Sequence, residues 1–328
     1  MGASLASTLY ELPLTIGLIG ELGAGKTAFL QGFAGAIGIR EQLTSPTYAL
    51  EQLYECPRCE LLHIDLYRLA QRQAENLLSG SENFSGIRCI EWFDRAYMNI
   101  PGHAQLHSQD RAPLILIEMS EAAPAERCLD FRFHDIVLPT CDQICEWRRS
   151  VMLPGHIAEH CEAVAEFAAK LGGVLVGNGK VVRRLALCRA AQAHDLFRFL
   201  DFRPGGHPRS DYPSETLSEW AKIRARYHGM HHEQACAEFL DEHGFAALSA
   251  IVAVHGLDRP PPLSATIEQK ILFYADKRVM CERVVSLEER FADFARRYGN
   301  GAVSGEAKRW YAITRQIEES LFPQGPPF

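Results

Sequence analysis

The stretch LTIGLIGELGAGKT, from Leu14 to Thr27, sets the architecture of the first part of this chain. Its apolar run Thr15–Ile19 predicts a buried strand, the glycine-rich segment predicts a tight loop, and a helix is expected to begin near Lys26. The pattern G-x-x-x-x-G-K-T surrounds one anion with backbone N–H groups and a helix N-terminus, which favours phosphate binding. Lys26 is then expected on the β- and γ-phosphates of a nucleotide, and the Thr27 hydroxyl on Mg²⁺. The residues predicted to bind the nucleotide in this loop are Gly20, Gly23, Gly25, Lys26 and Thr27.

The pattern of predicted secondary structure changes near residue 150. Between residues 14 and 138, short β-like runs alternate with loops and helical stretches, which is typical of an α/β domain. Beyond residue 149, strand-like runs nearly disappear and helical periodicity prevails, which predicts an all-α domain. The length of 328 residues is also twice the roughly 150 residues of one domain. We therefore expect one domain at residues 1–149 and a second at residues 150–328, joined by the connecting segment Thr140–Ser150.

Composition and charge exclude several classes of protein. Lys and Arg minus Asp and Glu give 34 − 41 = −7, so the whole chain offers no electrostatic attraction for nucleic acid. No apolar run approaches the roughly 20 residues that span a bilayer, and Met1–Leu12 lacks the features of a secretory signal. The ten cysteines are scattered, as in a reducing compartment. We expect a cytoplasmic protein without a membrane segment, whose one tight pair, Cys56 and Cys59, is either a plain loop between strands or a zinc or redox site.

Two carboxylates follow strand-like runs in the first domain. Asp65 follows the run Leu61–Ile64, and Glu91 ends the run Ile87–Ile90. A phosphate-binding loop of this kind needs acids at strand ends to hold Mg²⁺ and to orient the attacking water. Asp65 and Glu91 are therefore candidates for catalysis and, with Thr27, for Mg²⁺ binding. The alternative interpretation is that each is a solvated loop carboxylate.

Four segments in a fixed order give a resemblance to a known family. They are Gly20–Thr27, the SPTY run Ser45–Tyr48, the HIDLYR run His63–Arg68 and the IEW run Ile90–Trp92. Over about residues 9–138 the chain resembles TsaE, the ATPase subunit of the bacterial machinery that installs threonylcarbamoyl on adenosine 37 of tRNA. The corresponding family segments are G-[DE]-L-G-A-G-K-T, S-P-T-[FY], H-x-D-x-Y-R and [IV]-E-W. Two loop-sized departures from the family spare these segments, and they are Cys56–Glu60 and Asn99–Arg111.

The TsaE resemblance implies ATP hydrolysis inside a larger assembly. It implies that Lys26 and Thr27 contact phosphates and Mg²⁺, with ATP and Mg²⁺ as cofactors. It places Asp65 and Glu91 on the side of the Mg²⁺ and the water, and Thr47 in a switch-like segment beside the nucleotide. It also implies two partner subunits of the TsaD and TsaB type. Because the net charge is −7, contact with tRNA is expected to be indirect, through those partners.

Histidine and aspartate recur on the inward faces of helices predicted in the second domain. His160 shares a predicted helix with an apolar face, and the pair His194-Asp195 follows an apolar run on the next predicted helix. Buried ionisable groups are costly without partners, so several that converge on one core point to a metal. A His/Asp set without thiolates favours Mn, Fe, Co, Ni or a non-structural Zn site. The candidate ligands are His160, His194, Asp195, His232, His255 and Asp276.

The same ordered set resembles the HD-domain phosphohydrolases over about residues 151–295. The resemblance places His160, His194, Asp195 and Asp276 in the core metal set. His232 and His255 match the histidines that complete a two-metal site in HDIG-like branches. It implies a divalent metal that activates water for attack on phosphorus, Asp195 among the catalytic residues, and a phosphorylated small molecule as substrate. A metal-binding module without catalysis and plain packing of the side chains remain as alternatives.

Three functions are compatible with these features. The first is a TsaE-like ATPase of tRNA threonylcarbamoylation, fused to a metal-dependent HD phosphohydrolase whose substrate is unknown. The second is a P-loop kinase for a small molecule or nucleotide, fused to a regulatory metal-binding HD module. The third is a regulatory binding protein that ATP switches and whose HD domain is a scaffold. The expected fold is an α/β P-loop NTPase domain followed by an all-α HD-type helical domain.

Overall fold

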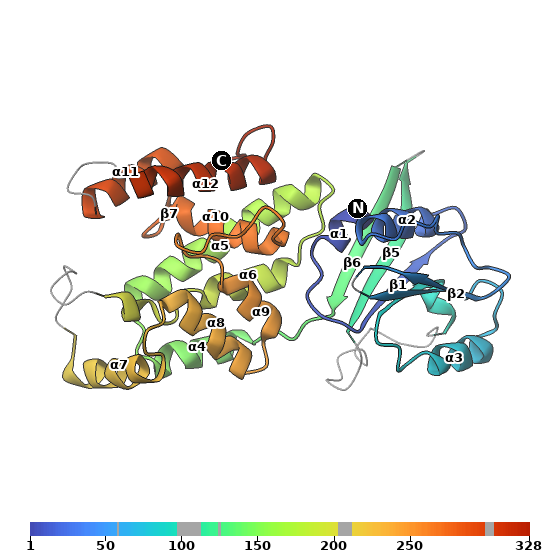
Figure 1. Ribbon diagram of the computed structural model, residues 1–328, viewed down its shortest axis with the longest axis horizontal. Coiled ribbons are helices and arrows are strands. Elements are labelled where there is room, and N and C mark those ends of the chain that lie inside the picture. The colour runs from blue at the N-terminus through green and yellow to red at the C-terminus, as the bar shows by residue number, and fades with distance from the viewer. Residues whose placement is uncertain (58, 97–112, 124–125, 203–211, 299–304) are drawn as a thin grey trace. The chain divides into compact units, whose positions relative to one another are not determined.

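The computed structural model describes residues 1–57, 59–96, 113–123, 126–202, 212–298 and 305–328. The predicted departure Asn99–Arg111 lies outside these described residues. The chain divides into two compact units, Met1–Ile136 (unit 1) and Val137–Phe328 (unit 2), and each is described by itself (Figure 1). Among the described helices, none combines the length and the apolar character that crossing a membrane requires.

Unit 1 is built on a six-stranded mixed sheet in the order β2-β3-β4-β1-β5-β6. The inner strands β3, β4, β1 and β5 run parallel, while β2 and β6 pair antiparallel at the two edges. The strands are β1 (Leu14–Gly20), β2 (Glu51–Glu55), β3 (Glu60–Asp65), β4 (Ile87–Glu91), β5 (Leu114–Ala123) and β6 (Glu126–His134). Because β1, β3 and β4 are parallel neighbours, their carboxyl ends meet at one edge of the sheet.

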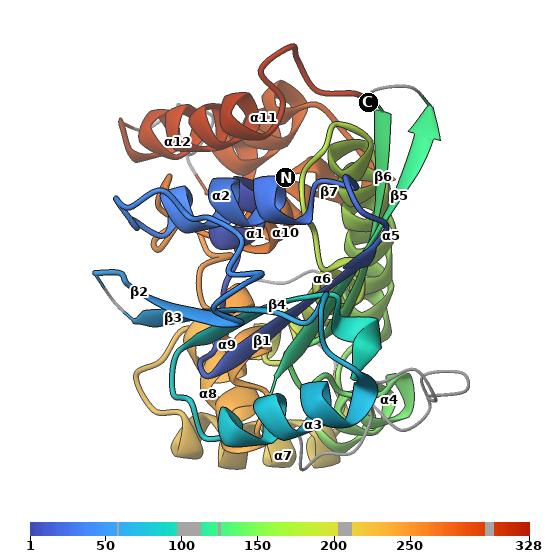
Figure 2. The same ribbon diagram turned by 90° about the vertical axis from the view of Figure 1, so that its right-hand side faces the viewer.

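Helices cover both faces of this sheet. The helices are α1 (Gly2–Ala6), α2 (Lys26–Ala36), α3 (Gln71–Gly80) and the short 3₁₀ turn η1 (Phe93–Arg95). Figures 1 and 2 both show α1 and α2 on one face of the sheet and α3 on the other. Ala74 and Leu78 of α3 pack in a core cluster with Ile64, Ile90 and Leu116 of the strands. The predicted α/β character of the first domain is therefore confirmed.

Unit 2 is helical, as predicted. Its helices are α4 (Cys141–Ser150), α5 (Gly155–Gly177), α6 (Arg184–Ala193), η3 (Arg198–Asp201), α7 (Ser214–Arg226), α8 (His232–Glu242), α9 (Ala246–Val252), α10 (Ile267–Arg278), α11 (Leu287–Tyr298) and α12 (Gly305–Leu321). A small ribbon joins β7 (Val279–Met280) to β8 (Arg283–Val284). The apolar stripe of α5, which includes Val164 and Leu171, is buried, and α5 packs against α6 and α10.

The segment Thr140–Ser150 is a helix rather than a connection. Thr140 caps α4 by accepting from the backbone N–H of Gln143, and the Gln143 side chain accepts from the N–H of Thr140 in return. Trp147 of this helix packs edge-on against Phe239 and Phe245, with ring centroids 5.2 and 5.6 Å away. The expected seam at residues 149/150 thus falls at the end of α4, whereas the two units divide between residues 136 and 137.

Candidate functional site

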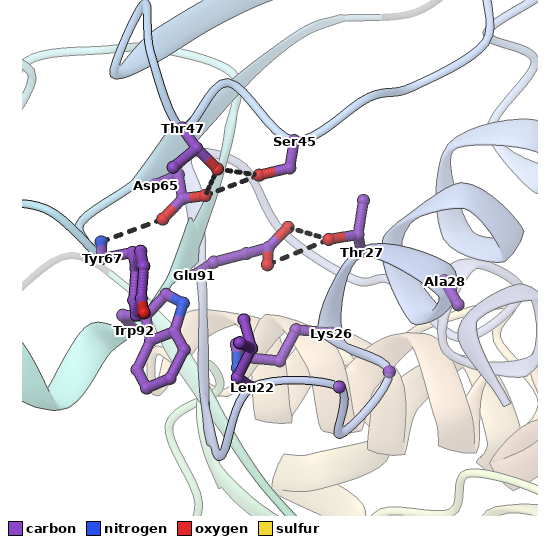
Figure 3. A pocket seen from close by; sticks show the side chains of 12 residues that line it. Leu22, Lys26, Thr27, Ala28, Ser45, Thr47, Asp65, Tyr67, Glu91 and Trp92 are labelled. Carbon is purple, nitrogen blue, oxygen red and sulfur yellow. Dashed lines mark hydrogen bonds between the residues drawn. The ribbon is translucent and has the colours of Figure 1, made fainter.

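The glycine-rich loop of unit 1 lies between β1 and α2, at the edge where the parallel strands end. Gly25 immediately precedes α2 with φ of 100°, a left-handed conformation that favours glycine. A Cβ added to Gly20 would lie 2.5 Å from the carbonyl oxygen of Met119, so the approach of loop and strand also requires glycine. The loop lines a cavity of about 290 Å³ together with Thr47, Asp65 and Glu91 (Figure 3). The structure therefore brings together the predicted nucleotide residues and the predicted acids.

Lys26 is folded back over its own loop in this structure. Its Nζ donates to the carbonyl oxygens of Gly20 at 2.6 Å and Glu21 at 3.0 Å. The same atom lies 3.8 Å from the centroid of the Trp92 ring, a cation–π contact. Burial lowers the pKa of Lys26, and the nearby carboxylates, Glu91 first, oppose this shift. Lys26 must exchange these partners for phosphate oxygens if a nucleotide binds as predicted.

Glu91, at the end of β4, is held between Thr27 and His63. The Thr27 hydroxyl donates to both carboxylate oxygens of Glu91, at 2.8 and 3.1 Å. His63 Nε2 lies 3.0 Å from Glu91 Oε1, and both side chains are almost fully buried. Because His63 Nδ1 is buried and makes no hydrogen bond within the described residues, we assign the proton to Nε2, which then donates to Glu91. His63 lies in the HIDLYR run, but the sequence alone did not give it this role.

Asp65, at the end of β3, accepts hydrogen bonds from the switch-like segment that contains Thr47. Its Oδ2 accepts from the hydroxyls of Ser45 at 2.6 Å and Thr47 at 2.7 Å, and its Oδ1 accepts from the backbone N–H of Tyr67 at 2.9 Å. Asp65 also pairs with Glu91 in the register of β3 and β4. The two acids are therefore next to each other at the sheet edge, and Figure 3 shows both beside the loop. Hydroxyl and carboxylate oxygens are the ligands that Mg²⁺ prefers, so this set fits the ion.

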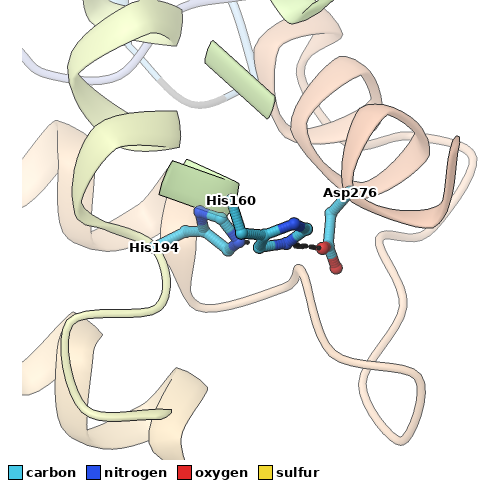
Figure 4. Close-up of side chains that lie close together, drawn as sticks. All are labelled: His160, His194 and Asp276. Atoms are coloured by element: carbon cyan, nitrogen blue, oxygen red, sulfur yellow. Dashed lines mark hydrogen bonds and ion pairs between the residues drawn. The ribbon is translucent and has the colours of Figure 1, made fainter. Parts of the chain in front are cut away.

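In unit 2, three predicted ligands from different parts of the chain meet in one place. His160 of α5 has its Nε2 3.0 Å from Oδ1 of Asp276, which belongs to α10. His194 Nε2 lies 3.7 Å from the same oxygen and 3.8 Å from Oδ2 of Asp195. Figure 4 shows the two histidine rings and Asp276 directed toward one another. Their ligand atoms all lie within 4.8 Å of each other, a grouping that could hold a metal ion.

A second group adjoins the first through Asp195. Oδ1 of Asp195 lies 2.9 Å from His232 Nε2 and 3.7 Å from His255 Nε2. Because the other oxygen of Asp195 faces His194, this carboxylate stands between the two groups, where it could bridge two metal ions. His194, Asp195 and His255 form a second candidate ligand triad. All six predicted ligands therefore converge in unit 2.

The residues of this cluster fit a metal ion. His194 Nε2 is buried and makes no hydrogen bond within the described residues, which is costly unless another ligand satisfies it. Burial opposes charge on His194, but Asp195, Asp276 and Cys161 together raise the pKa of His194 well above its usual value. Burial would likewise raise the pKa of Asp195, yet His194 and His232 hold it well below the usual value. A divalent cation would replace these imidazole protons as the counter-charge of the carboxylates.

Two expectations about this cluster are corrected. The pair His194-Asp195 was expected on a helix, but α6 ends at Ala193 and the pair begins the turn that follows. His255 was expected to continue the helical spacing of its neighbours, but α9 ends at Val252 and His255 is buried in the loop beyond it. His255 Nδ1 lies 2.6 Å from the carbonyl oxygen of Val252, which fixes the ring from the end of the helix. His194, Asp195 and His255 therefore enter the cluster from segments that follow a helix, and not from the face of a helix.

The sequence interpretation missed acidic neighbours of His232. Glu233 forms a further candidate triad with His232 and His255, and its Oε2 lies 3.3 Å from His232 Nδ1. Asp201 contacts the same ring atom, and its pKa falls to about 2 because His232, Arg198 and His231 together outweigh the effect of burial. Glu233 stands next to His232 in the sequence, so a search for carboxylates beside candidate histidines would have found it. Nothing in the sequence marks Asp201.

The fold and the loop define unit 1 as an α/β P-loop domain of the nucleotide-binding type. A family model described as "Threonylcarbamoyl adenosine biosynthesis protein TsaE" matches residues 1–121. The tRNA threonylcarbamoyladenosine biosynthesis protein TsaE of Treponema pallidum is 36% identical over 104 residues, 30% of this chain and 73% of that protein. The TsaE protein of Borreliella burgdorferi is 38% identical over 102 residues, 29% of this chain and 74% of that protein. The chain therefore belongs to the TsaE family.

The family assignment concerns unit 1, since the family model ends at residue 121. A TsaE protein of the cyanobacterium Nostoc is 41% identical over 100 residues, 29% of this chain and 61% of that protein. A solved structure of Bacillus subtilis YdiB is 25% identical and covers 40% of this chain and 76% of that one, with a TM-score of 0.31.

Proposed function

We propose that unit 1 binds and hydrolyses ATP with Mg²⁺ in support of threonylcarbamoylation of adenosine 37 in tRNA. The observation that carries this proposal is the pairing of Thr27 and Glu91 beside the glycine-rich loop, with Asp65 on the neighbouring strand. The relatives of unit 1 carry tRNA threonylcarbamoyladenosine biosynthesis in their names. We expect this work in the cytoplasm, with subunits of the TsaD and TsaB type as partners that hold the tRNA.

The residues around the loop would divide the chemistry as follows. Backbone N–H groups of the loop and Lys26 would bind the phosphates, and Mg²⁺, when bound, would neutralise charge on the β- and γ-phosphates. Glu91 would orient the attacking water, and His63 would keep its carboxylate in place from behind. Asp65 would hold Ser45 and Thr47 close to the nucleotide, so this segment is placed to respond to the γ-phosphate.

Nucleotide titration of Lys26→Ala tests the ATP site. Loss of a hydrogen-bonded charge costs about 1.5–3 kcal/mol, so we expect ATP affinity to fall by roughly 10- to 150-fold in calorimetry. Exposed Arg40→Ala in the same unit is the control, and it should bind as wild type. Unchanged affinity in Lys26→Ala would exclude the assigned site. ATP hydrolysis stimulated by the partner subunits supports the ATPase, whereas phosphate transfer to an acceptor would favour a kinase.

For unit 2 we propose a metal-dependent phosphohydrolase that acts on a phosphorylated small molecule such as a nucleotide. The carrying observation is the convergence of histidines and carboxylates from separate elements, with His194 Nε2 buried among them and without a hydrogen bond within the described residues. A divalent transition metal (Mn, Fe, Co, Ni or Zn), when bound, would activate water and screen phosphate charge. The residues that would hold it are His160, His194, Asp195, His232, His255 and Asp276.

We propose different roles for Asp276 and Asp195. Lys277 donates to Oδ2 of Asp276 and, at 2.9 Å, to the carbonyl oxygen of His255, so it orients the aspartate. Oδ1 of Asp276 is left toward His160 and His194. Asp195 presents one oxygen to each histidine group, so it is the residue we expect to bridge metals and to contribute to catalysis.

Metal analysis of the purified full chain, before and after titration with Mn²⁺ and Zn²⁺, tests this proposal. We expect at least one bound ion per chain in wild type and none in Asp195→Ala, while ATP binding by unit 1 is unchanged. A screen of nucleotide phosphatase and phosphodiesterase activity, with His194→Ala as the inactive control, would identify the substrate. A wild-type chain that takes up no transition metal would end the hydrolase proposal.

A further inference from the structure

The turn between β2 and β3 carries two cysteines that face each other. Glu55 and Glu60 are the last paired residues of the two strands, and Cys56 and Cys59 follow directly at the turn. The backbone N–H of Cys56 donates to the carbonyl oxygen of Cys59 at 3.0 Å, which closes the hairpin. This hydrogen bond and the pairing of Glu55 with Glu60 hold the two cysteines opposite each other at the end of the strand pair.

The sulfur atoms are closer than a metal site needs. Sγ of Cys56 lies 2.7 Å from Sγ of Cys59, and it also lies 2.7 Å from the Cys59 carbonyl oxygen. Two thiolates on a tetrahedral zinc, each bonded at about 2.3 Å, are about 3.8 Å apart, whereas bonded sulfur atoms are about 2.05 Å apart. The candidate metal groups among the described residues contain neither cysteine. The separation favours a sulfur–sulfur bond over zinc.

The surroundings hold the turn and leave its sulfur atoms accessible. Pro57 packs against Gly38, since a Cβ added at Gly38 would lie 3.0 Å from Cδ of the proline. Both cysteines are half-buried, so a small reagent can reach them. Burial and the hydrogen bond with Cys56 raise the pKa of the Cys59 thiol to about 12. The raised pKa makes the Cys59 thiol slow to attack a disulfide at neutral pH.

We propose that Cys56 and Cys59 are a reversible oxidation site, which a low-molecular-weight disulfide converts to an intrachain disulfide. The Cys56 thiolate attacks one sulfur of the reagent, a mixed disulfide forms, and one thiol of the reagent leaves. Cys59 then attacks the Cys56 sulfur, the intrachain bond forms, and the second reagent thiol leaves. The two protons of the cysteines end on the two released thiols, and the two electrons reduce the reagent.

Equilibration of the full chain with oxidised and reduced glutathione, at several ratios, tests this proposal. After acid quenching and alkylation, we expect the peptide with both cysteines to lose the mass of two hydrogen atoms and to escape alkylation. Excess reduced glutathione should restore two alkylated thiols. Exposed Cys145 is the internal reference, because it should take up glutathione as a mixed disulfide under the same conditions.

Single variants distinguish an intrachain disulfide from independent reaction of two accessible thiols. Cys56→Ser and Cys59→Ser should each leave one cysteine that carries glutathione, whereas Cys145→Ser should keep the bridge. Two free thiols on the turn while Cys145 is modified would overturn the proposal, as would two glutathione adducts on one turn. Tight Zn²⁺ uptake that protects both thiols in wild type, and is lost in Cys56→Ser, would also overturn it. ATP binding is measured in each variant to show that unit 1 is folded.

Discussion

The two units each bring carboxylates and hydrogen-bonding groups together in one place, but the partners of these carboxylates differ. In unit 1, Asp65 accepts from Ser45 and Thr47, and Glu91 accepts from Thr27. In unit 2, the Asp195 and Asp276 carboxylates face histidines, and His194 Nε2 is buried without a hydrogen bond within the described residues. A buried polar atom without a partner costs about 1–3 kcal/mol. The carboxylates of unit 1 are thus held by hydroxyl donors, whereas those of unit 2 lie among imidazoles that a cation would bind if it enters as we propose.

The two sites also differ in how the chain assembles them. In unit 1 the parallel sheet places the ends of β1, β3 and β4 side by side, so Asp65, Glu91 and the glycine-rich loop meet at one edge. In unit 2 the ligands come from α5, from turns after α6 and α9, and from α8 and α10. Backbone hydrogen bonds fix the first arrangement, whereas side-chain packing fixes the second. We expect the second site to be more sensitive to changes in its hydrophobic core.

The largest expected effect tests whether α4 is part of unit 2. Trp147→Ala removes a buried ring that contacts Phe239 and Phe245, and such truncations cost about 3–5 kcal/mol. Hydrogen exchange followed peptide by peptide should show faster exchange throughout unit 2 and unchanged exchange in unit 1. The exposed neighbour Glu146→Ala should leave both units unchanged. Faster exchange confined to unit 1 would contradict the division of the chain after Ile136.

The next effect concerns catalysis in unit 1. Glu91→Gln keeps the shape of the side chain but removes the charge that orients water, so we expect ATP hydrolysis to fall by about 10²–10³-fold. ATP affinity should change by less than tenfold, because the loop and Lys26 remain. Calorimetry and phosphate release, measured with the partner subunits, check this split. Exposed Glu41→Gln is the matched control, and equal rates in both variants would remove Glu91 from the mechanism.

Addition of a transition metal should stabilise unit 2 more than unit 1. A ligand present at a hundred times its dissociation constant stabilises the native state by about 2.7 kcal/mol. Mn²⁺ or Zn²⁺, added with Mg²⁺ already present, should therefore raise the thermal transition of unit 2 more than that of unit 1, and a chelator should reverse the shift. His160→Gln, which removes one ligand near Asp276, should reduce the shift. An equal shift in both units would mean that the buried atoms of unit 2 are not the cause.

Much of the fold and many of the candidate site residues could be predicted from the sequence. The features that could not be predicted depend on tertiary structure. The P-loop segment is local, so its residues followed from the run Leu14–Thr27, and the α/β class followed from the alternation of strand-like and helical runs over residues 14–138. The helical character of unit 2 followed from periodicity, but the inward direction of His255 comes from a loop whose path depends on tertiary packing. Asp201 has no sequence pattern that marks it, because only the fold brings it to His232. The role of His63 depends on the register of β3 and β4, which one strand alone does not define.

The smallest effect separates the positioning of Glu91 from its charge. His63→Gln keeps a donor near Glu91 Oε1 but changes its direction and length, so we expect hydrolysis to fall by about three- to tenfold, equivalent to the roughly 1 kcal/mol of one hydrogen bond. His63→Leu, which removes the donor and leaves a buried carboxylate oxygen with one partner fewer, should lower it further while ATP affinity stays the same. The order wild type, Gln, Leu in kcat at constant affinity is what a positioning role predicts. If both variants lose ATP binding and unit 1 exchanges hydrogen faster, His63 stabilises the core of the sheet rather than the position of Glu91. In that case the site of unit 1 is not held in place by its own side chains, and it does not differ from the site of unit 2 in the way described above.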